Sequence, residues 1–201
     1  MKIPQLVLSL CLAAVLGAFV TPWAYQRCWQ GIQWSLQHPP SHPQATAIGA
    51  GVGVALILWR KPNRLVHTLI HEACHAILCL VLCVPVRSFQ ASDGNGGQVV
   101  HDKTDPLRTI LICLAPYTLP LLLAPALLAS YWVPGGELRR VLAGLIALLY
   151  IHHLQGLFRN VRLNFWGTQA DLSKAGKVLS LVSIATVLML VTNWTLSRLW
   201  A

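Results

Sequence analysis

The residues whose types and spacing could carry out chemistry lie in one short stretch. The run His71-Glu72-Ala73-Cys74-His75 has the H-E-x-x-H form. On a helix, residues four apart lie about 40° apart around the axis and one turn along it. The imidazoles of His71 and His75 can therefore reach the same zinc ion. Glu72 lies beside them and can remove a proton from a water that this zinc activates. The pattern is typical of a zinc-dependent peptidase.

The surroundings of this motif strengthen the zinc interpretation. It lies inside the apolar stretch Leu65–Val84, which is long enough to cross a membrane. A carboxylate and two imidazoles placed there lose their hydration, which costs several kcal/mol unless something compensates. A bound metal compensates directly, so the sequence favours zinc over a hydrogen-bonded polar cluster.

A catalytic zinc usually has a third protein ligand and one position open for water. The chain has only six acidic residues, and Asp171, just before the last apolar stretch, is the best-placed candidate. Two interpretations remain open for it. Asp171 is either the third ligand or an acid at a helix N-terminus that is stabilised by the helix dipole. The other acids outside the motif belong to turns or to the region of the expected hairpin: Asp93, Asp102, Asp105 and Glu137.

Other polar residues in apolar or flanking positions are weaker candidates. His67 lies one turn before His71 and is either a residue supporting the site or an interfacial histidine. Cys79 is more simply a small packing residue than a ligand. His153 is a candidate for stabilising the oxyanion that forms during attack on a peptide bond. Asn160 and Asn164 either hydrogen-bond a substrate backbone or cap a connecting segment.

The composition identifies the environment in which these residues work. Of 201 residues, 55% are hydrophobic and 10% are charged, and the mean hydropathy is +0.59. Soluble domains carry roughly a quarter charged residues, so a soluble globule is excluded. The net charge of +9 comes from basic residues between apolar stretches, such as Arg60–Arg64. Such positions contact lipid headgroups, so we expect a lipid bilayer and no nucleic acid as partner. The six cysteines indicate small buried residues rather than disulfides.

The apolar stretches predict the fold class, an all-α polytopic membrane protein with about six transmembrane helices. Prolines at 116, 120 and 125 should kink or break the fourth span. We expect Gly49 and Gly53 to share a helix face and to allow close helix packing. Non-helical polar segments are expected at Gln26–Gln44 and Arg159–Lys174. The six spans are Leu6–Trp23, Ala45–Trp59, Leu65–Val84, Leu107–Val133, Val141–Phe158 and Ala175–Trp200.

A small β-structure is expected directly after the H-E-x-x-H helix. Val86–Gln90 and Gln98–His101 resemble short strands, and Asp93–Gly97 between them has the composition of a turn. The predicted organisation is two N-terminal transmembrane helices with a loop over residues 1–63, followed by a metalloprotease-like membrane core over residues 64–201.

These features together resemble the site-2 protease family of intramembrane zinc metalloproteases. His67–Ala76, HTLIHEACHA, resembles the first active-site helix of that family. A polar β-rich segment and then an aspartate at a later core helix follow in the family's order, and Gly96-Gly97-Gln98-Val99 resembles its glycine-containing strand. The resemblance spans about residues 64–180. It implies zinc held by His71, His75 and Asp171, with Glu72 as the general base.

The same resemblance suggests that Gly96 and Gly97 contact the substrate, and by their own chemistry His153 and Asn160 are further candidates for contact with the substrate or the transition state. Two positions depart from the family's pattern. Cys74 stands where members commonly have glycine, and Gln169-Ala170-Asp171-Leu172 replaces the usual Leu-Asp-Gly wording. The assignment of Asp171 therefore depends on order and context.

The function expected from the sequence is an intramembrane zinc endopeptidase that cleaves a transmembrane segment of another membrane protein. A multi-pass protein of a bacterial-type inner membrane is expected, and the sequence indicates no particular oligomeric state. Two alternatives remain. A non-proteolytic membrane scaffold of the same fold is motivated by the unusual context of Asp171. A metal transporter is suggested by the histidines, but only the third and fifth spans carry them, and Glu72 suits hydrolysis better than conduction.

Overall fold

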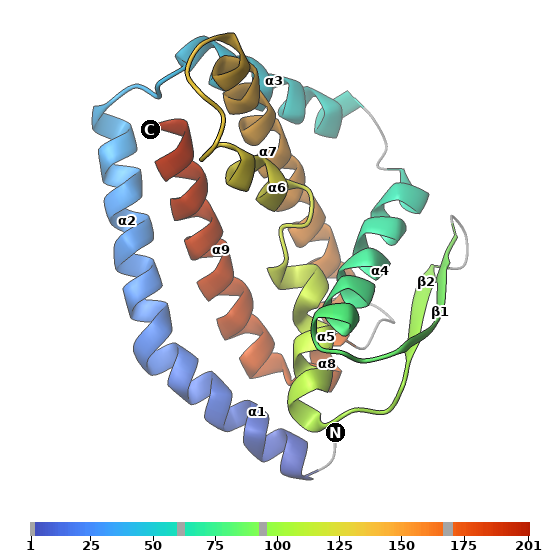
Figure 1. Cartoon of the computed structure of the whole chain (residues 1–201). Coiled ribbons are helices and arrows are strands. Elements are labelled where there is room, and N and C mark those ends of the chain that lie inside the picture. Colours follow the sequence, from blue (N-terminus) through green and yellow to red (C-terminus); the bar gives the residue numbers. More distant parts are fainter. Residues whose placement is uncertain (1–2, 60–62, 93–95, 167–170) are drawn as a thin grey trace. The chain divides into compact units, whose positions relative to one another are not determined.

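The computed structural model describes residues 3–59, 63–92, 96–166 and 171–201, without the side chains of residues 165 and 166. Helices and one two-stranded antiparallel sheet make up the regular structure of these residues (Figure 1). Two compact units are present. The first comprises residues 1–19, 62–119 and 157–185, and the second comprises residues 20–61, 120–156 and 186–201.

The first unit contains the H-E-x-x-H motif. Helix α4 contacts helix α5 and both strands, and α5 also contacts α1 and the short helix α8. The end of α7 from residue 157 and the start of α9 to residue 185 complete the unit. Its elements are α1 (Ile3–Val15), α4 (Arg64–Val81), β1 (Val86–Ala91), β2 (Gly97–His101), α5 (Pro106–Thr118), α8 (Asp171–Ala175), and parts of α7 (Glu137–Trp166) and α9 (Lys177–Leu199).

The regular structure of the second unit is entirely helical in the described residues. It contains α2 (Thr21–Gln37), α3 (Pro43–Trp59), α6 (Leu123–Ala129) and the remaining parts of α7 and α9; a π-helical segment, η1 (Leu16–Val20), precedes α2. Helices α3 and α7 cross at glycines. A Cβ on Gly49 would overlap the backbone carbonyl of Gly144, and one on Gly53 would lie 3.0 Å from Ile151 Cβ. The close helix packing expected at Gly49 and Gly53 is therefore confirmed.

The helices have the length and composition of membrane spans. Four helical segments qualify among the described residues, and a fifth qualifies if α5 and α6 are one span broken between residues 118 and 123. Large apolar side chains such as Leu58 and Val141 are exposed on the helices, as lipid-facing residues are. The all-α polytopic fold is confirmed, as is the break at the prolines. The span expected at residues 45–59 is helix α3. With 17 residues it is shorter than the segments that qualify as spans.

Helix α4 begins at a local sequence signal. The side chain of Asn63 accepts a hydrogen bond from the backbone N–H of Val66 at 3.2 Å, which satisfies one free donor of the first turn. The burial of His71, Glu72 and His75 places the polar face of this apolar helix inside the unit. The cap therefore stabilises the start of the helix whose buried face carries the motif.

The expected β-hairpin is present. β1 and β2 pair in antiparallel register, from Val86 opposite His101 to Ala91 opposite Gly97. At the base of the hairpin, both Arg87 Nε and Arg87 Nη2 donate to the carboxylate of Asp102, at 2.7 and 2.8 Å. This interaction holds the pKa of Asp102 below its usual range. The turn expected at 93–97 lies outside the described residues at positions 93–95.

Parts of two segments expected to be non-helical are helical. Helix α2 continues to Gln37, because the chain-breaking prolines begin only at Pro39, and residues 38–42 are non-helical as expected. Helix α7 continues to Trp166, inside the connector expected at Arg159–Lys174, of which residues 167–170 lie outside the described residues. Asn160 and Asn164, which suggested a connector by their polarity, are four apart on this helix and both are buried. Their polarity marks an inward-facing helix surface.

Candidate metal centre

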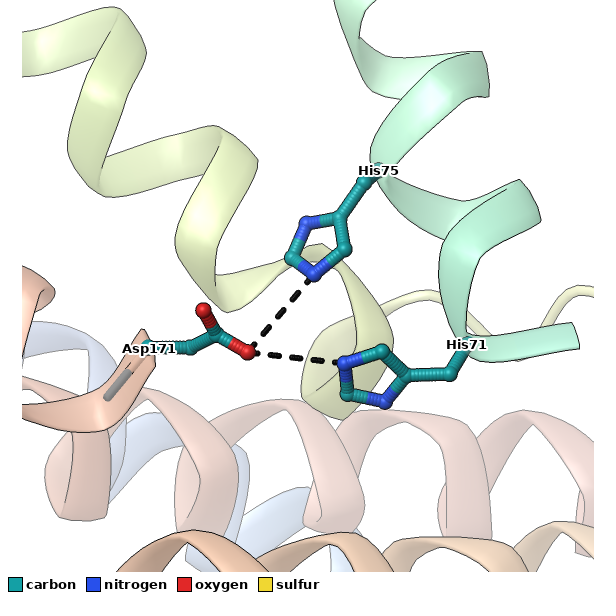
Figure 2. Close-up of side chains that lie close together, drawn as sticks. All are labelled: His71, His75 and Asp171. Carbon is teal, nitrogen blue, oxygen red and sulfur yellow. Dashed lines mark ion pairs between the residues drawn. The ribbon is translucent and has the colours of Figure 1, made fainter. Parts of the chain in front are cut away.

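Three side chains from two distant segments meet in the first unit. His71 and His75 project from successive turns of α4, and Asp171 projects toward them from the first residue of α8 (Figure 2). Asp171 Oδ2 lies 3.4 Å from His71 Nε2 and 3.7 Å from His75 Nε2. One ligand atom from each residue lies within 4.8 Å of the others. This is the constellation expected from the sequence for a metal ion.

The other ring nitrogen of each histidine already has a partner. His75 Nδ1 donates to the backbone carbonyl of Ile112 at 2.7 Å. His71 Nδ1 lies 3.2 Å from Asn160 Oδ1. The Asn160 amide is oriented by its Nδ2, which donates to the carbonyl of Pro116 at 3.2 Å, so that its oxygen must face His71. Both imidazoles therefore carry their proton on Nδ1.

This proton placement leaves a lone pair on each Nε2, and both Nε2 atoms face Asp171. Two imidazole nitrogens and one carboxylate oxygen form a donor set that zinc favours in catalytic sites, where a fourth position stays open. Hydrogen bonds that fix the unligated nitrogen are the usual support of such ligands. The residues present therefore fit a zinc ion, with His71, His75 and Asp171 as the side chains that would hold it.

The short helix α8 is held in place by its backbone and by buried side chains. Leu172 and Ala175 are buried. Ser180 Oγ, on α9, lies 3.2 Å from the Leu172 carbonyl oxygen, within hydrogen-bonding distance. Gln5 Nε2, on α1, donates to the Lys174 carbonyl at 2.8 Å. The turn into α9 is made by Gly176, whose φ of +100° favours glycine. These contacts fix the position from which Asp171 projects.

The charge of Asp171 suits a ligand. The side chain is only 18% exposed, and its Oδ2 faces the Nε2 atoms of both histidines. A metal binds the deprotonated carboxylate, and a cation held between these atoms would stabilise that form.

Glu72 lies on α4 next to the ligands and faces the hairpin. It is buried, and a Cβ built on Gly97 would lie 2.5 Å from Glu72 Cγ and 2.6 Å from Thr68 Cγ2. Gly97 thus allows the backbone of β2 to pass directly over the glutamate. Gly96 differs, because a Cβ there would contact nothing within 4 Å and its φ of +76° serves the turn. Of the two predicted glycines, Gly97 is the one beside the motif.

The remaining candidates have other surroundings. Cys79 packs with Val84 and Ile112 in a small apolar cluster, which confirms its packing interpretation. Cys74 is buried within the motif, and His67 is half-buried one turn before His71. Asn160 supports His71, and Asn164 Nδ2 donates to the Asn160 carbonyl at 3.2 Å. His153 is half-buried on α7 and belongs to the second unit. Its predicted role is not tested.

Two contributors to the site were missed from the sequence. The Ile112 carbonyl has no residue-type signature, since every residue has a carbonyl. Tyr117 is 1% exposed, and its ring lies edge-on to His71 with centroids 6.0 Å apart. Its hydroxyl has no hydrogen-bond partner among the described residues. A tyrosine one residue after Pro116, inside a broken apolar span, was the available signal.

Comparison with known families agrees with this geometry. The family model described as Peptidase M50B-like matches residues 45–165, more than half of the chain. The chain belongs to this family of membrane-embedded metalloproteases, which confirms the resemblance to site-2 proteases. The match contains His71, Glu72 and His75 but ends before Asp171, so the case for Asp171 depends on the geometry above. No curated protein and no solved structure matches the chain.

Proposed function

We propose that this protein is an intramembrane zinc endopeptidase. The observation that carries the proposal is the meeting of His71, His75 and Asp171, whose ligand atoms lie within 4.8 Å of one another, directly beside a buried glutamate. Membership of the Peptidase M50B-like family supports the same reaction class. The substrate class is a peptide bond in or near a transmembrane segment of another membrane protein.

Each residue has a defined task in the proposed reaction. His71, His75 and Asp171 hold the zinc ion, which when bound polarises the scissile carbonyl and lowers the pKa of a water. Glu72 accepts the proton of the attacking water and returns it to the leaving amine. The buried Tyr117 hydroxyl is a donor available to a bound substrate.

The hairpin is the element that we propose to receive the substrate. A transmembrane helix shields its amides, so it must unwind before cleavage. β2 carries its backbone over Glu72 at Gly97, and the hairpin has two strands in the described part of the chain. An unwound substrate can add to such a sheet as a further strand. The apolar helices support a reaction within a bilayer, and we propose that this bilayer is a bacterial inner membrane.

The test compares the wild-type protein with Glu72→Gln. Purified wild-type protein should contain one zinc per chain, and Glu72→Gln should retain it, since Glu72 is not a ligand. In cells that produce either form, labelling of new N-termini in the membrane fraction should identify cleavages inside transmembrane segments with the wild type alone. These substrates are then co-reconstituted with each form in liposomes to measure cleavage directly.

Three outcomes separate the alternatives. Wild-type protein without zinc contradicts the proposal altogether. Equal cleavage by Glu72→Gln contradicts the role of Glu72. Bound zinc without any cleavage difference favours the non-proteolytic scaffold, and zinc flux into liposomes favours the transporter.

A further inference from the structure

Helix α5 contains an unusual pair of backbone carbonyls. In an α-helix the carbonyl of each residue accepts a hydrogen bond from the N–H four residues later. Pro116 has no N–H to offer Ile112, and Pro120 has none to offer Pro116. Both Ile112 and Pro116 are buried, in a helix that forms part of a candidate membrane span. Neither carbonyl can therefore rely on helical donors or on bulk water.

Both carbonyls accept hydrogen bonds at the metal centre. The Ile112 carbonyl accepts from His75 Nδ1 at 2.7 Å. The Pro116 carbonyl accepts from Asn160 Nδ2 at 3.2 Å, and the oxygen of the same amide accepts from His71 Nδ1 at 3.2 Å. One histidine is thus supported directly and the other through one side chain.

The spacings of the two helices correspond. Pro116 and Pro120 are four residues apart, so the carbonyls that they release are one helical turn apart. His71 and His75 are also four residues apart on α4, which packs against α5. Two acceptors spaced by one turn therefore support two imidazoles spaced by one turn, one of them directly and the other through Asn160.

We propose that Pro116 and Pro120 are positioning residues of the metal centre. By lacking an N–H, they reserve the Ile112 and Pro116 carbonyls for the ring of His75 and, through Asn160, for the ring of His71. The inference rests on the proposed function only in that it concerns the same site. It goes beyond that function because it says what decides which ring nitrogen of His71 and of His75 carries the proton. The deciding residues are the two prolines, Pro116 and Pro120.

The consequence follows from imidazole chemistry. A neutral imidazole has one N–H, and the acceptor that binds it decides which nitrogen keeps a lone pair. With Nδ1 held, Nε2 is the ligand atom and the ring cannot rotate freely. Loss of such an outer partner typically lowers metal affinity by about 10–100-fold.

The decisive variant is Pro116→Ala. Alanine continues the helix and restores an N–H in position to occupy the Ile112 carbonyl, which then competes with His75. We expect zinc affinity to fall about 10–100-fold, measured by competition with a chromophoric chelator on the full-length protein in detergent. The visible spectrum of the cobalt-substituted protein should change as well, because the geometry at His75 relaxes. Helical content should stay the same or rise.

The matched control is Pro125→Ala. Pro125 is exposed in the first turn of α6, which belongs to the second unit, and the three candidate ligands belong to the first. This variant should keep wild-type zinc affinity. Asn160→Ala removes the other link and should lower zinc affinity as Pro116→Ala does.

A double substitution excludes a general packing effect. In a His75→Ala background, Pro116→Ala should change the residual zinc affinity by less than about twofold, since no imidazole remains to compete for the carbonyl. A folded Pro116→Ala protein with wild-type zinc affinity and cobalt spectrum overturns the inference. So does an equal loss in the His75→Ala background. Because the readout is metal binding, a wild-type protein that binds zinc but cleaves nothing contradicts only the proposed function.

Discussion

Glu72 is buried and Asp171 is half-buried, and these two acids of an apolar chain have different neighbours. Asp171 faces two imidazole nitrogens at 3.4 and 3.7 Å, whereas Glu72 faces the backbone of a strand at Gly97. A carboxylate that faces two nitrogen lone pairs is repelled by them unless a cation or a proton lies between, so this position suits a metal ligand. A carboxylate beside an open strand can instead exchange protons with a bound water or substrate.

Asp171→Ala tests the third ligand. Removing the carboxylate takes one of three donors from the metal, so zinc affinity should fall by more than the roughly 100-fold upper range for outer partners. Chelator competition on the purified protein measures this. Asp102→Ala removes an exposed acid that pairs with Arg87 and should leave zinc affinity unchanged. Wild-type affinity in Asp171→Ala would assign Asp171 to the helix-dipole interpretation instead.

Gly97→Ala tests the contact between β2 and Glu72. The new methyl carbon would lie 2.5 Å from Glu72 Cγ, so either the glutamate or the strand must move. Zinc stays bound because no candidate ligand is touched, but cleavage should fall by up to about 10²–10⁴-fold, the typical contribution of a positioned general base. Turnover of a substrate identified with the wild type measures it.

Gly135→Ala is the control for this substitution, since a Cβ there meets nothing within 4 Å. It should cleave at the wild-type rate. If Gly97→Ala also cleaves at that rate, β2 does not constrain Glu72.

At the residue scale, the sequence predicted the candidate ligands but not the groups that hydrogen-bond to them. His71, Glu72 and His75 form a motif, and Asp171 is conspicuous among six acids. The Ile112 carbonyl could not be predicted, because its role follows from the missing N–H of Pro116 and from packing against α4. Tyr117 was missed for a related reason: its position against His71 is set by the pairing of two helices.

At the scale of elements, α7 shows how polarity in a membrane helix can be misread. Arg159, Asn160, Arg162 and Asn164 suggested a connector, since four polar residues in six are rare in a span. Yet the helix continues to Trp166 and presents Asn160 to His71. The two asparagines are four residues apart, so they lie on one face of a helix. This spacing was a signal for a helix that the polar composition obscured.

The crossing of α3 and α7 in the second unit gives a stability prediction. Gly49→Ala places a methyl group into the Gly144 carbonyl, so the helices must separate or bend. Overpacking of this kind typically costs about 1–3 kcal/mol of unfolding free energy. Unfolding in mixed detergent micelles by SDS titration measures the loss.

Gly51→Ala is the matched control on the same helix. A Cβ at Gly51 meets nothing within 4 Å, so stability should change by less than about 0.5 kcal/mol. Equal stability of Gly49→Ala and Gly51→Ala would contradict the close crossing.

At the scale of the whole molecule, composition predicted the membrane class but not where individual spans break or end. Six apolar stretches were expected, and the described residues contain four qualifying segments plus one broken pair. Hydropathy identifies apolar segments equally well whether they cross fully, break at prolines or stop short, as α3 does with 17 residues. Helix length and breaks depend on packing, which a hydropathy pattern does not contain.

The location of the metal centre within one unit makes metal removal a local event. All three ligands belong to the first unit, whereas the core around Leu127 and Ile146 belongs to the second. Chelation of zinc should therefore abolish cleavage and leave the helical circular dichroism nearly unchanged. This differs from small zinc domains, which unfold without metal. Membrane helices keep their backbone hydrogen bonds in lipid whether or not metal is bound.

Hydrogen–deuterium exchange resolves where the effect of chelation is confined. Without zinc, exchange should increase in residues 171–175 and around His71 and His75, because metal binding no longer stabilises their arrangement. Exchange around Gly49 and Gly144 should not change, since that crossing depends on helix packing alone. Returning zinc should restore protection and cleavage together. Uniform deprotection of both units on chelation would show instead that the metal holds the entire fold.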